Sequence, residues 1–306
     1  MSDFGAAVKL TGAECLTYNC ATAADLSHVR SLLFAPGSDE RKLVKALGSD
    51  ADAVVADLED AVAPSEKAAA RALVRDVFAA VTNPNAGPNV GTGPLRLVRV
   101  NAVGTAFHAG DMAAVAAIEP DAIVLPKASP AAVDTLGADG PPVVAIVETS
   151  QGVRLAYEIA SRTRVTALQI GAVDLGAEVG LEPRRDGLEL VYVRSKVVLD
   201  SVAAGLRSPF DVVHLDIEAD AALEEECRLA RSLGFRGKAC IHPSQVPVVN
   251  RAFTPSESEL AWARKVLAAY EVAAGEGRGA VALDGAMIDL PVVERARRLL
   301  AETERR

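Results

Sequence analysis

The sequence predicts an α/β protein built on a (β/α)8 barrel, or TIM barrel, with a helical extension at its C-terminus. Two observations predict this fold. Short runs rich in Val, Ile and Leu alternate along the chain with longer segments of helical spacing. Eight such runs are followed by helical segments within about 250 residues, the usual size of the fold. A doubly wound open sheet is the competing architecture, and it usually has fewer strands.

The expected strands are continuous apolar runs. Runs of this kind are typical of strands buried on both faces, and therefore of a parallel sheet. In chain order they are Arg30–Ala35, Asp52–Asp57, Leu95–Val100, Asp121–Leu125, Pro142–Val147, Val165–Ile170, Asp211–Leu215 and Lys238–Ile241.

Helices are expected between the strands and after the last one. Pro64 and Glu66 flank Ser65, and all three are common where helices begin. Gly205 and Gly234 stand where two long amphipathic helices should end, because glycine often follows the last helical residue. The most regular candidates are Ser65–Val81, Gly187–Leu206, Glu218–Leu233, Pro255–Ala274 and Pro291–Arg305.

Three parts are expected along the chain. Residues 1–28 precede the first strand as an extension, residues 29–253 form the barrel, and residues 254–306 form a helical segment outside it. Asn83–Gly93 is a turn-rich loop before the third strand, and Gly275–Gly279 is a bend between the last two helices. Such a C-terminal segment packs on its own barrel or reaches a neighbouring subunit.

Composition excludes several classes of protein. The 306 residues carry a net charge of −9 without a long Lys/Arg run, which argues against a nucleic-acid partner. Apolar runs stay well below the roughly 20 residues that a membrane span needs, and the N-terminus does not resemble a signal peptide. We therefore expect a cytoplasmic protein that does not bind a membrane. Its scattered cysteines should be reduced; they are Cys15, Cys20, Cys227 and Cys240.

Polar residues follow the expected strands, where barrels of this type carry their active sites. They are Pro36–Gly37, Asp57–Asp60, Arg99 and Asn101, Pro126–Lys127, Glu148–Ser150, Gly171 and Asp174, His214 and Asp216, and His242–Pro243.

Two carboxylates among them are candidates for a metal site. Glu148 ends the fifth run and Asp174 follows the sixth by a short turn, so adjacent strands should bring them together. Two carboxylates with room for water and substrate oxygens suit Mg²⁺. The alternative makes Asp174 a helix N-cap and Glu148 a solvated loop acid.

Arg99 ends the third run and should point inward or lie at the rim. A guanidinium there can hold a carboxylate through two parallel hydrogen bonds. It can equally pair with the acids of Asp57–Asp60, which themselves favour the start of a helix. His242, after the last strand, is as compatible with holding a loop as with carrying a proton.

Nine ordered stretches together resemble one family, the citrate lyase β-subunit-like proteins, which include malyl-CoA and citramalyl-CoA lyases within the HpcH/HpaI aldolase superfamily. The resemblance spans roughly residues 29–300. The stretches are RSLLFAPG (30–37), ADAVVADLEDAVAPSEKAAAR (51–71), VRVN (98–101), IVLPKA (123–128), AIVETSQGV (145–153), IGAVDLGAEVG (170–180), GFRGKACIHPSQV (234–246), FTPSESE (253–259) and DGAMIDLP (284–291).

The resemblance implies a (β/α)8 fold and a Mg²⁺ ion held by the residues that match the family's ligands, Glu148 and Asp174. It implies that Arg99 contacts the acid or oxo group of the substrate. Phe34 and Lys45 match the residues on the CoA-binding side.

For the C-terminal segment, the resemblance implies an acid that reaches a neighbouring subunit's site as the catalytic base, and Asp289 matches it. A homotrimer, or a hexamer of two trimers, is then expected. The alternative for Asp289 is a helix N-cap, because it stands two residues before Pro291.

The expected activity is a Mg²⁺-dependent carbon–carbon lyase. Its substrate would be a 3-hydroxy-3-carboxy-type acyl-CoA like malyl-CoA or citramalyl-CoA, and its products an acyl-CoA enolate and a 2-oxo acid. Three different activities stay open. They are an aldolase that acts on free 2-oxo acids without CoA, an acyl-CoA thioesterase, and a citrate lyase β subunit that works on an acyl-carrier protein within a complex.

Overall fold

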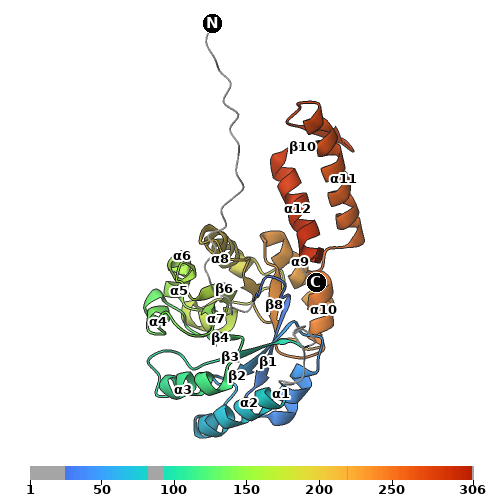
Figure 1. Cartoon of the computed structure of the whole chain (residues 1–306). Coiled ribbons are helices and arrows are strands. Elements are labelled where there is room, and N and C mark those ends of the chain that lie inside the picture. Colours follow the sequence, from blue (N-terminus) through green and yellow to red (C-terminus); the bar gives the residue numbers. More distant parts are fainter. Residues whose placement is uncertain (1–24, 82–92, 219, 305–306) are drawn as a thin grey trace.

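A closed barrel of eight parallel strands forms the centre of the computed structural model, which describes residues 25–81, 93–218 and 220–304 (Figure 1). The strands follow one another in chain order, and β8 pairs with β1, so the sheet has no open edge. The predicted barrel is confirmed and the open sheet is excluded. The strands are β1 (Ser31–Pro36), β2 (Ala53–Asp57), β3 (Leu95–Arg99), β4 (Ala122–Leu125), β5 (Val143–Val147), β6 (Val165–Ile170), β7 (Phe210–Asp211) and β8 (Gly237–Cys240).

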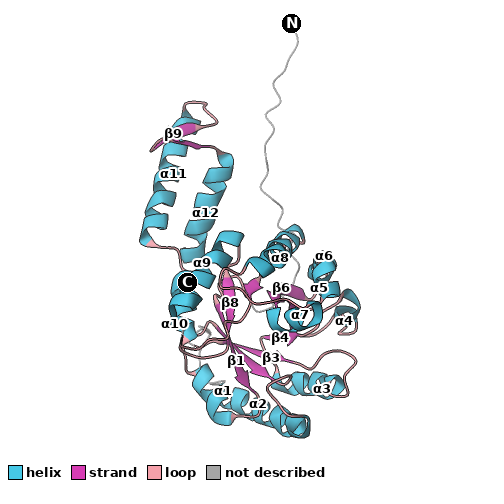
Figure 2. Ribbon diagram, turned by 180° about the vertical axis from the view of Figure 1, so that it is seen from behind, coloured by secondary structure: helices cyan, strands magenta, loops and turns pink. Residues whose placement is uncertain are grey.

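Helices surround the barrel and continue beyond it (Figure 2). Gly205 and Gly234 follow two of the helices with φ of 79° and 107°, so both predicted helix ends are confirmed. The helices are α1 (Glu40–Leu47), α2 (Lys67–Val81), α3 (His108–Ile118), α4 (Pro130–Asp134), α5 (Ser150–Arg154), α6 (Ala156–Ala160), α7 (Ala172–Val179), α8 (Val191–Ala203), α9 (Asp220–Leu233), α10 (Gln245–Ala252), α11 (Glu257–Gly275) and α12 (Leu290–Glu304), with 3₁₀ turns at Pro64–Glu66 and Leu188–Leu190.

The seventh strand is shorter than the sequence predicts. The apolar run Asp211–Leu215 suggests a strand, but β7 ends at Asp211. Beyond it, side chains hold the backbone in place of a neighbouring strand. The His214 ring lies 2.7 Å from a carboxylate oxygen of Glu226, and Gln245 Nε2 donates to the His214 carbonyl at 2.9 Å.

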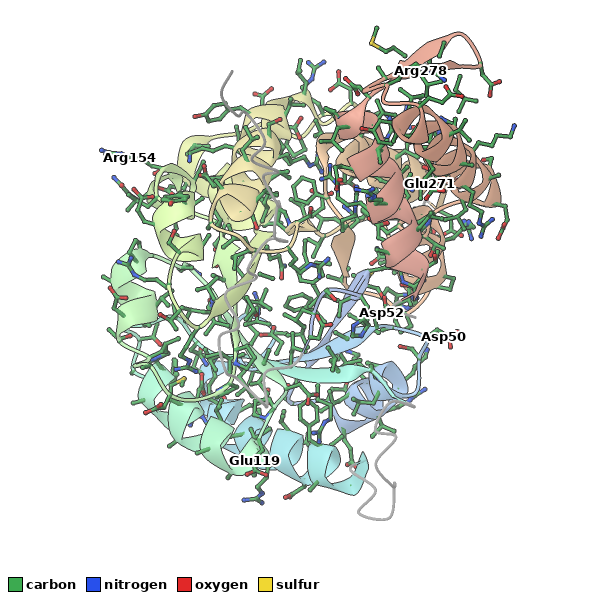
Figure 3. The ribbon with its side chains drawn as sticks, turned by 45° about the horizontal axis from the view of Figure 1, so that its top comes forward. Asp50, Asp52, Glu119, Arg154, Glu271 and Arg278 are labelled. Atoms are coloured by element: carbon green, nitrogen blue, oxygen red, sulfur yellow. The ribbon has the colours of Figure 1, made fainter. Side chains whose placement is uncertain are left out.

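Side chains from successive strand residues alternate between the barrel interior and the helical layer. The outward-facing residues pack with the helices in one large cluster. The inward-facing residues form a separate apolar cluster that fills the middle of the ring of strands (Figure 3). Its strand members are Leu32, Ala53, Val55, Leu97, Ala122, Val124, Val144, Ile146, Ala167 and Phe210, with Phe34 and Leu95 packed against them.

The last part of the expected N-terminal extension belongs to the barrel. Leu26 and Val29 are buried in the inner cluster, and Arg207 donates to both of their carbonyls at 2.7 and 3.1 Å. Leu26 therefore packs with the barrel although it precedes the predicted boundary at residue 28. Residues 1–24, with Cys15 and Cys20, and most of the loop Asn83–Gly93 lie outside the described residues.

The two remaining cysteines, Cys227 and Cys240, are buried and free. In the part of the chain that the structure describes, no helix is long and apolar enough to cross a membrane.

The C-terminal segment forms an arm that projects from the barrel (Figures 1 and 2). Helices α11 and α12 pack against each other and share a hydrophobic core with a short antiparallel hairpin, β9 (Val281–Leu283) and β10 (Ala286–Ile288). Three-residue strands give too short a pattern to predict, so the sequence indicated only a glycine-rich bend here. Figure 3 shows Glu271 on α11 and Arg278 towards the outer end of the arm.

Candidate active site at the mouth of the barrel

A cavity of about 440 Å³ opens at the carboxyl ends of the strands. This is the end at which a (β/α)8 barrel carries its active site. The lining residues are Phe34, Ala35, Pro36, Asp57, Asp60, Ala61, Arg99, Ile146, Glu148, Gln169, Ile170, Gly171, Ala172, Val173, Asp174, Val213 and Ile241. The cavity thus combines an apolar floor and wall with a set of acids around one arginine.

Glu148 follows β5 and is buried, with 4% of its surface exposed. Its Oε1 accepts a 2.7 Å hydrogen bond from the backbone N–H of Lys127. Burial raises the pKa of Glu148 to about 7, and the charge of Asp174 adds to the effect. The interpretation of Glu148 as a solvated loop acid is therefore wrong, and Glu148 is a buried carboxylate close to a second acid.

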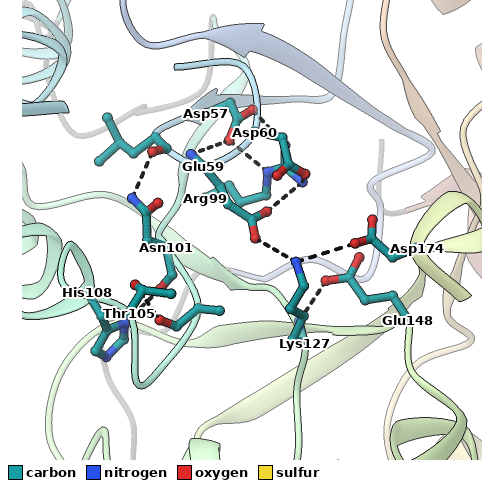
Figure 4. Close-up of polar contacts among 12 residues, drawn as sticks. Asp57, Glu59, Asp60, Arg99, Asn101, Thr105, His108, Lys127, Glu148 and Asp174 are labelled. Atoms are coloured by element: carbon teal, nitrogen blue, oxygen red, sulfur yellow. Dashed lines mark hydrogen bonds and ion pairs between the residues drawn. The ribbon is translucent and has the colours of Figure 1, made fainter. Parts of the chain in front are cut away.

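Asp174 lies in the first turn of α7, beyond the end of β6. The N-cap position of α7 is Gly171, and no side chain caps the helix, so the interpretation of Asp174 as the N-cap is wrong. Lys127 Nζ lies 3.3 Å from Asp174 Oδ1. One lysine therefore contacts both candidate ligands, through its backbone at Glu148 and through its side chain at Asp174 (Figure 4).

The donor set fits Mg²⁺. Among the described residues, no group of three or more His, Cys, Asp or Glu side chains is arranged to hold a metal ion. Zinc sites need three or four such ligands, whereas Mg²⁺ takes one or two carboxylates and fills its remaining positions with water and substrate oxygens. Glu148 and Asp174 supply two carboxylates beside a cavity large enough for both.

Arg99 ends β3 and lies beside the same cavity. Its Nε and Nη2 donate to the two oxygens of Asp57 at 2.7 and 2.6 Å. Its Nη1 lies 2.9 Å from Glu59 Oε2 and 3.4 Å from Asp60 Oδ2. The predicted ion pairs with these acids are therefore present, and they hold the guanidinium at the cavity wall (Figure 4).

The acids of Asp57–Asp60 do not start a helix, contrary to the sequence interpretation. Asp57 accepts backbone hydrogen bonds from Glu59 and Ala61 at 2.8 and 3.0 Å, so it closes a turn. The 3₁₀ turn that leads into α2 begins later, at Pro64. A local Asp–backbone turn competes with the helix for these residues.

The sequence places Lys127 at the rim without a specific role, and Glu59 among the acids that can pair with Arg99. Lys127 Nζ lies 3.2 Å from Glu59 Oε1, and the lysine has a φ of 48°, which is uncommon for a residue with a side chain. Burial raises the pKa of Glu59, against the opposing charge of Arg99. Burial lowers the pKa of Lys127, but the nearby acids outweigh burial and the pKa is raised. The negative charge of Glu59 makes the largest contribution to the rise. The signal in the sequence was the Pro–Lys pair directly after a strand.

Two other rim residues hold loops. Asn101 Nδ2 donates to the carbonyl of Leu58 at 2.8 Å and to Asp111 at 2.6 Å. The His242 ring lies 2.7 Å from the hydroxyl of Ser244.

Phe34 and Lys45 lie on the β1–α1 side of the mouth. Phe34 lines the cavity, and the Arg99 guanidinium lies 5.4 Å from the centre of its ring. Lys45 lines a separate, shallow hollow over α1 with Arg41. Asp39 caps α1 through a hydrogen bond from the backbone N–H of Lys42. Among the described residues, neither Arg41 nor Lys45 forms a salt bridge, so both cations are available to an anionic ligand.

Asp289 lies between β10 and α12, at the outer end of the arm. It does not line the cavity of its own chain. Its Oδ1 accepts a long hydrogen bond, 3.4 Å, from the backbone N–H of Val292, so it also caps α12. Met287 and Leu290 beside it are 74% and 52% exposed, which leaves an apolar tip around a carboxylate.

Comparison with known proteins identifies the family. The model of the HpcH/HpaI aldolase/citrate lyase family matches residues 30–243, which contain every strand of the barrel. The chain belongs to the HpcH/HpaI aldolase/citrate lyase family. The resemblance stated from the sequence motifs is thereby confirmed.

Relatives of this family member are similar over almost their whole length. It is 38% identical to a (3S)-malyl-CoA thioesterase of Cereibacter sphaeroides, over 90% of this chain and 94% of that one. It is 40% identical to a citrate lyase subunit beta-like protein of Mycobacterium tuberculosis, over 88% and 93%. A crystal structure of the protein CitE from M. tuberculosis with magnesium, acetoacetate and coenzyme A superposes with a TM-score of 0.77 at 39% identity, over 90% of this chain and 98% of that one.

Proposed function

We propose that this HpcH/HpaI family member is a Mg²⁺-dependent carbon–carbon lyase that acts on an acyl-CoA of the malyl-CoA or citramalyl-CoA type. The observation that carries the proposal is the pair Glu148 and Asp174 at one cavity with Arg99 on its wall. The CitE structure from M. tuberculosis, which contains magnesium, acetoacetate and coenzyme A, supports a site that binds a metal ion, an oxo acid and CoA together.

Glu148 and Asp174 would hold the metal. When bound, Mg²⁺ supplies a Lewis acid and a template for the carboxylate and hydroxyl oxygens of the substrate. Arg99 stabilises negative charge on a substrate oxygen at the cavity wall, where its guanidinium is already fixed by Asp57. Fixing the guanidinium beforehand removes the need to reorganise it during the reaction.

A base completes the reaction. It takes the proton of the substrate hydroxyl, the carbon–carbon bond breaks, and the electron pair of that bond moves onto the thioester as an enolate. The hydroxyl carbon becomes the oxo carbon of the 2-oxo acid. Protonation of the enolate then gives the acyl-CoA. In the reverse direction the base removes a proton from the carbon next to the thioester.

We assign the base to Asp289 of a neighbouring subunit. Within one chain, Asp289 lies at the end of an arm that projects from the barrel, and it is outside the cavity. The exposed Met287 and Leu290 give the arm an apolar tip that can dock on a second copy of the chain. This arrangement requires an oligomer, and we propose the homotrimer or hexamer expected from the family resemblance.

Coenzyme A would enter over α1. Lys45 and Arg41 line a hollow that the acids Asp39 and Glu40 also line. Neither cation has a salt-bridge partner among the described residues, so both could contact the phosphates of CoA. Phe34 lies at the cavity itself and would contact the acyl end of the ligand. This route would lead from the hollow over α1 to the two carboxylates.

A second candidate function is hydrolysis of the thioester, because the similar proteins of Cereibacter sphaeroides are (3S)-malyl-CoA thioesterases. The same metal site would serve that reaction. An aldolase without CoA, and a β subunit that takes its substrate from an acyl-carrier protein in a complex, would not use free CoA esters. Binding of CoA to the isolated protein therefore favours a stand-alone CoA-dependent enzyme over both of these activities.

One screen separates these reactions. The protein is incubated with malyl-CoA and citramalyl-CoA in Mg²⁺ or in EDTA, and the products are identified by mass spectrometry. The reverse reaction is tested with acyl-CoA esters and glyoxylate, pyruvate or oxaloacetate. The proposed lyase gives acyl-CoA and a 2-oxo acid only with Mg²⁺. Free CoA with a hydroxy diacid shows a thioesterase, and no turnover of any CoA ester contradicts the proposal.

A further inference from the structure

One lysine connects the acid that pairs with Arg99 to a proposed metal ligand. Lys127 Nζ donates to Glu59 Oε1 at 3.2 Å and lies 3.3 Å from Asp174 Oδ1. The other oxygen of Glu59 lies 2.9 Å from Arg99 Nη1. Figure 4 shows Lys127 between Glu59 on one side and Asp174 on the other. The ammonium is therefore shared between two carboxylates that have different roles in the site.

The backbone of Lys127 supports this placement. Its φ of 48° lies in the left-handed region, which is uncommon for a residue with a side chain. In this conformation the N–H faces Glu148 at 2.7 Å while the ammonium faces Asp174. Unfavourable backbone conformations of this kind persist where the surrounding contacts hold them, and they are frequent at functional sites.

Acids outnumber cations at the mouth of the barrel. Among the described residues, Arg99 and Lys127 are the cations that pair with the acids Asp57, Glu59, Asp60 and Asp174. Arg99 is held tightly, because it donates to both oxygens of Asp57 at 2.7 and 2.6 Å. Lys127 makes only single, longer side-chain contacts, and its side chain is 42% exposed. Lys127 is therefore the cation that can move at lower cost.

A cation that already neutralises Asp174 opposes the binding of a second cation there. Mg²⁺ held by Glu148 and Asp174 would share a carboxylate with the ammonium of Lys127, and like charges at such short range repel each other. Glu59 provides the ammonium with another carboxylate when Asp174 is occupied. Two acids on one flexible lysine thus allow an exchange without leaving the ammonium unpaired.

We propose that Lys127 competes with Mg²⁺ for Asp174 and so lowers the metal affinity of the site, while Glu59 retains the ammonium when the metal binds. The proposal rests on the proposed function, because it takes Glu148 and Asp174 as the metal ligands. Lys127 is a positioning residue in this role, since it acts on the metal through Asp174. A site that binds Mg²⁺ weakly by itself is then completed by the anionic oxygens of the substrate.

Calorimetric titration of Mg²⁺ into metal-free protein measures this competition. Lys127→Met removes the charge and keeps the length of the side chain, and Lys127→Asn removes the charge with a residue type that tolerates positive φ. We expect both neutral variants to bind Mg²⁺ about tenfold more tightly than the wild type. Lys127→Arg keeps the charge and should stay close to the wild type. A gain of affinity distinguishes competition from a structural role, because a displaced ligand would weaken binding.

Lys196→Met is the matched control. Lys196 pairs with Asp200 on α8 and does not line the cavity, so its loss removes one paired lysine from the chain without touching the site. Its Mg²⁺ affinity should equal that of the wild type. A gain as large as that of Lys127→Met would assign the effect to the net charge of the whole protein and overturn the proposal.

The remaining outcomes separate this proposal from the proposed function. Circular dichroism establishes which variants are folded. Equal or weaker Mg²⁺ binding in a folded Lys127→Met or Lys127→Asn protein overturns the competition and leaves the proposed lyase in place. If neither the wild type nor the neutral variants bind Mg²⁺, the proposed function fails and this inference fails with it.

Discussion

Glu148 and Gly171 are in such close contact that a β-carbon on Gly171 would lie 2.4 Å from Glu148 Oε2 and 2.6 Å from Glu148 Cβ. Both distances are shorter than any ordinary van der Waals contact. The glycine directly after β6 therefore leaves the space in which the carboxylate after β5 lies. Gly171 itself has a φ of −105°, so its role is steric and not conformational.

Gly171→Ala should displace the Glu148 carboxylate while leaving the barrel folded. We expect the affinity for Mg²⁺ to fall by at least about tenfold, because one of its two proposed ligands moves (1.4 kcal/mol corresponds to tenfold). Calorimetric titration of Mg²⁺ measures the loss. Gly176→Ala, in the helix α7 that follows Gly171, is the matched control, because the nearest atom to its β-carbon is 3.8 Å away. Equal affinities in both variants would show that the contact does not position the ligand.

The ionisation of Glu148 should cost stability in metal-free protein. The pKa of Glu148 is about 7 in the folded state, above its ordinary value of 4.5. Below pH 4.5 the carboxyl is neutral in both states and costs nothing. Between pH 4.5 and 7 the unfolded chain ionises first, and above pH 7 the full cost applies, on the order of 3 kcal/mol.

Glu148→Gln removes that cost and keeps an oxygen for the Lys127 N–H. In EDTA the variant should therefore be more stable than the wild type at pH 8 and equally stable at pH 4, as measured by urea unfolding. Glu178→Gln is the control, since Glu178 is an exposed acid whose pKa is lowered by its hydrogen bonds from Ser150, and it should give no gain at pH 8. If the urea-unfolding curves of the wild type and Glu148→Gln coincide at pH 8, ionisation of the buried carboxylate does not lower the stability of the folded state.

Arg99→Lys tests whether the guanidinium acts on the substrate. Lysine cannot make the two parallel hydrogen bonds to Asp57, so it loses the fixed geometry at the cavity wall. We expect kcat/KM for the preferred CoA ester to fall at least ~100-fold. Arg71→Lys is the control, because Arg71 pairs with Asp111 and does not line the cavity. A loss of tenfold or less would leave Arg99 as a structural ion-pair partner.

Mixing inactive subunits tests whether Asp289 acts across an interface. Asp289→Ala and Glu148→Ala chains are each expected to be inactive. After subunit exchange, some sites combine an intact Glu148 with an intact Asp289 from a neighbour, and activity should return. A mixture of Glu148→Ala with Asp174→Ala should stay inactive, because both residues belong to the same barrel. If subunits are shown to exchange and the mixture of Asp289→Ala and Glu148→Ala chains regains no activity, Asp289 does not act as a base in a neighbouring subunit's site.

The sequence predicted the barrel because its signals are local. Apolar runs, helical spacing and terminal glycines such as Gly205 and Gly234 each act within a few residues, and all of them agree. The seventh strand was overestimated because its end depends on distant partners. Gln245 and Glu226, which bind His214, lie on helices that periodicity cannot place against β7.

The sequence predicts which residues belong to the candidate site better than it predicts the contacts between them. Glu148 and Asp174 follow adjacent strands, so chain order alone brings them to one end of the barrel. Lys127 contacts both Glu148 and Asp174. Its left-handed backbone conformation has no signature in the sequence. The sequence does not single out Gln169 as a cavity residue, because a single polar residue in an apolar run is ordinary until its neighbours in the barrel are known.

Calorimetric titration of Mg²⁺ into metal-free wild-type, Glu148→Ala and Asp174→Ala protein tests the central claim most directly. Circular dichroism establishes that each variant is folded, and Glu178→Ala controls for removing an acid from the same helix as Asp174. The account predicts one Mg²⁺ site per chain in the wild type and in the control, and no measurable binding in either ligand variant. Wild-type affinity in a folded Glu148→Ala or Asp174→Ala protein would contradict it.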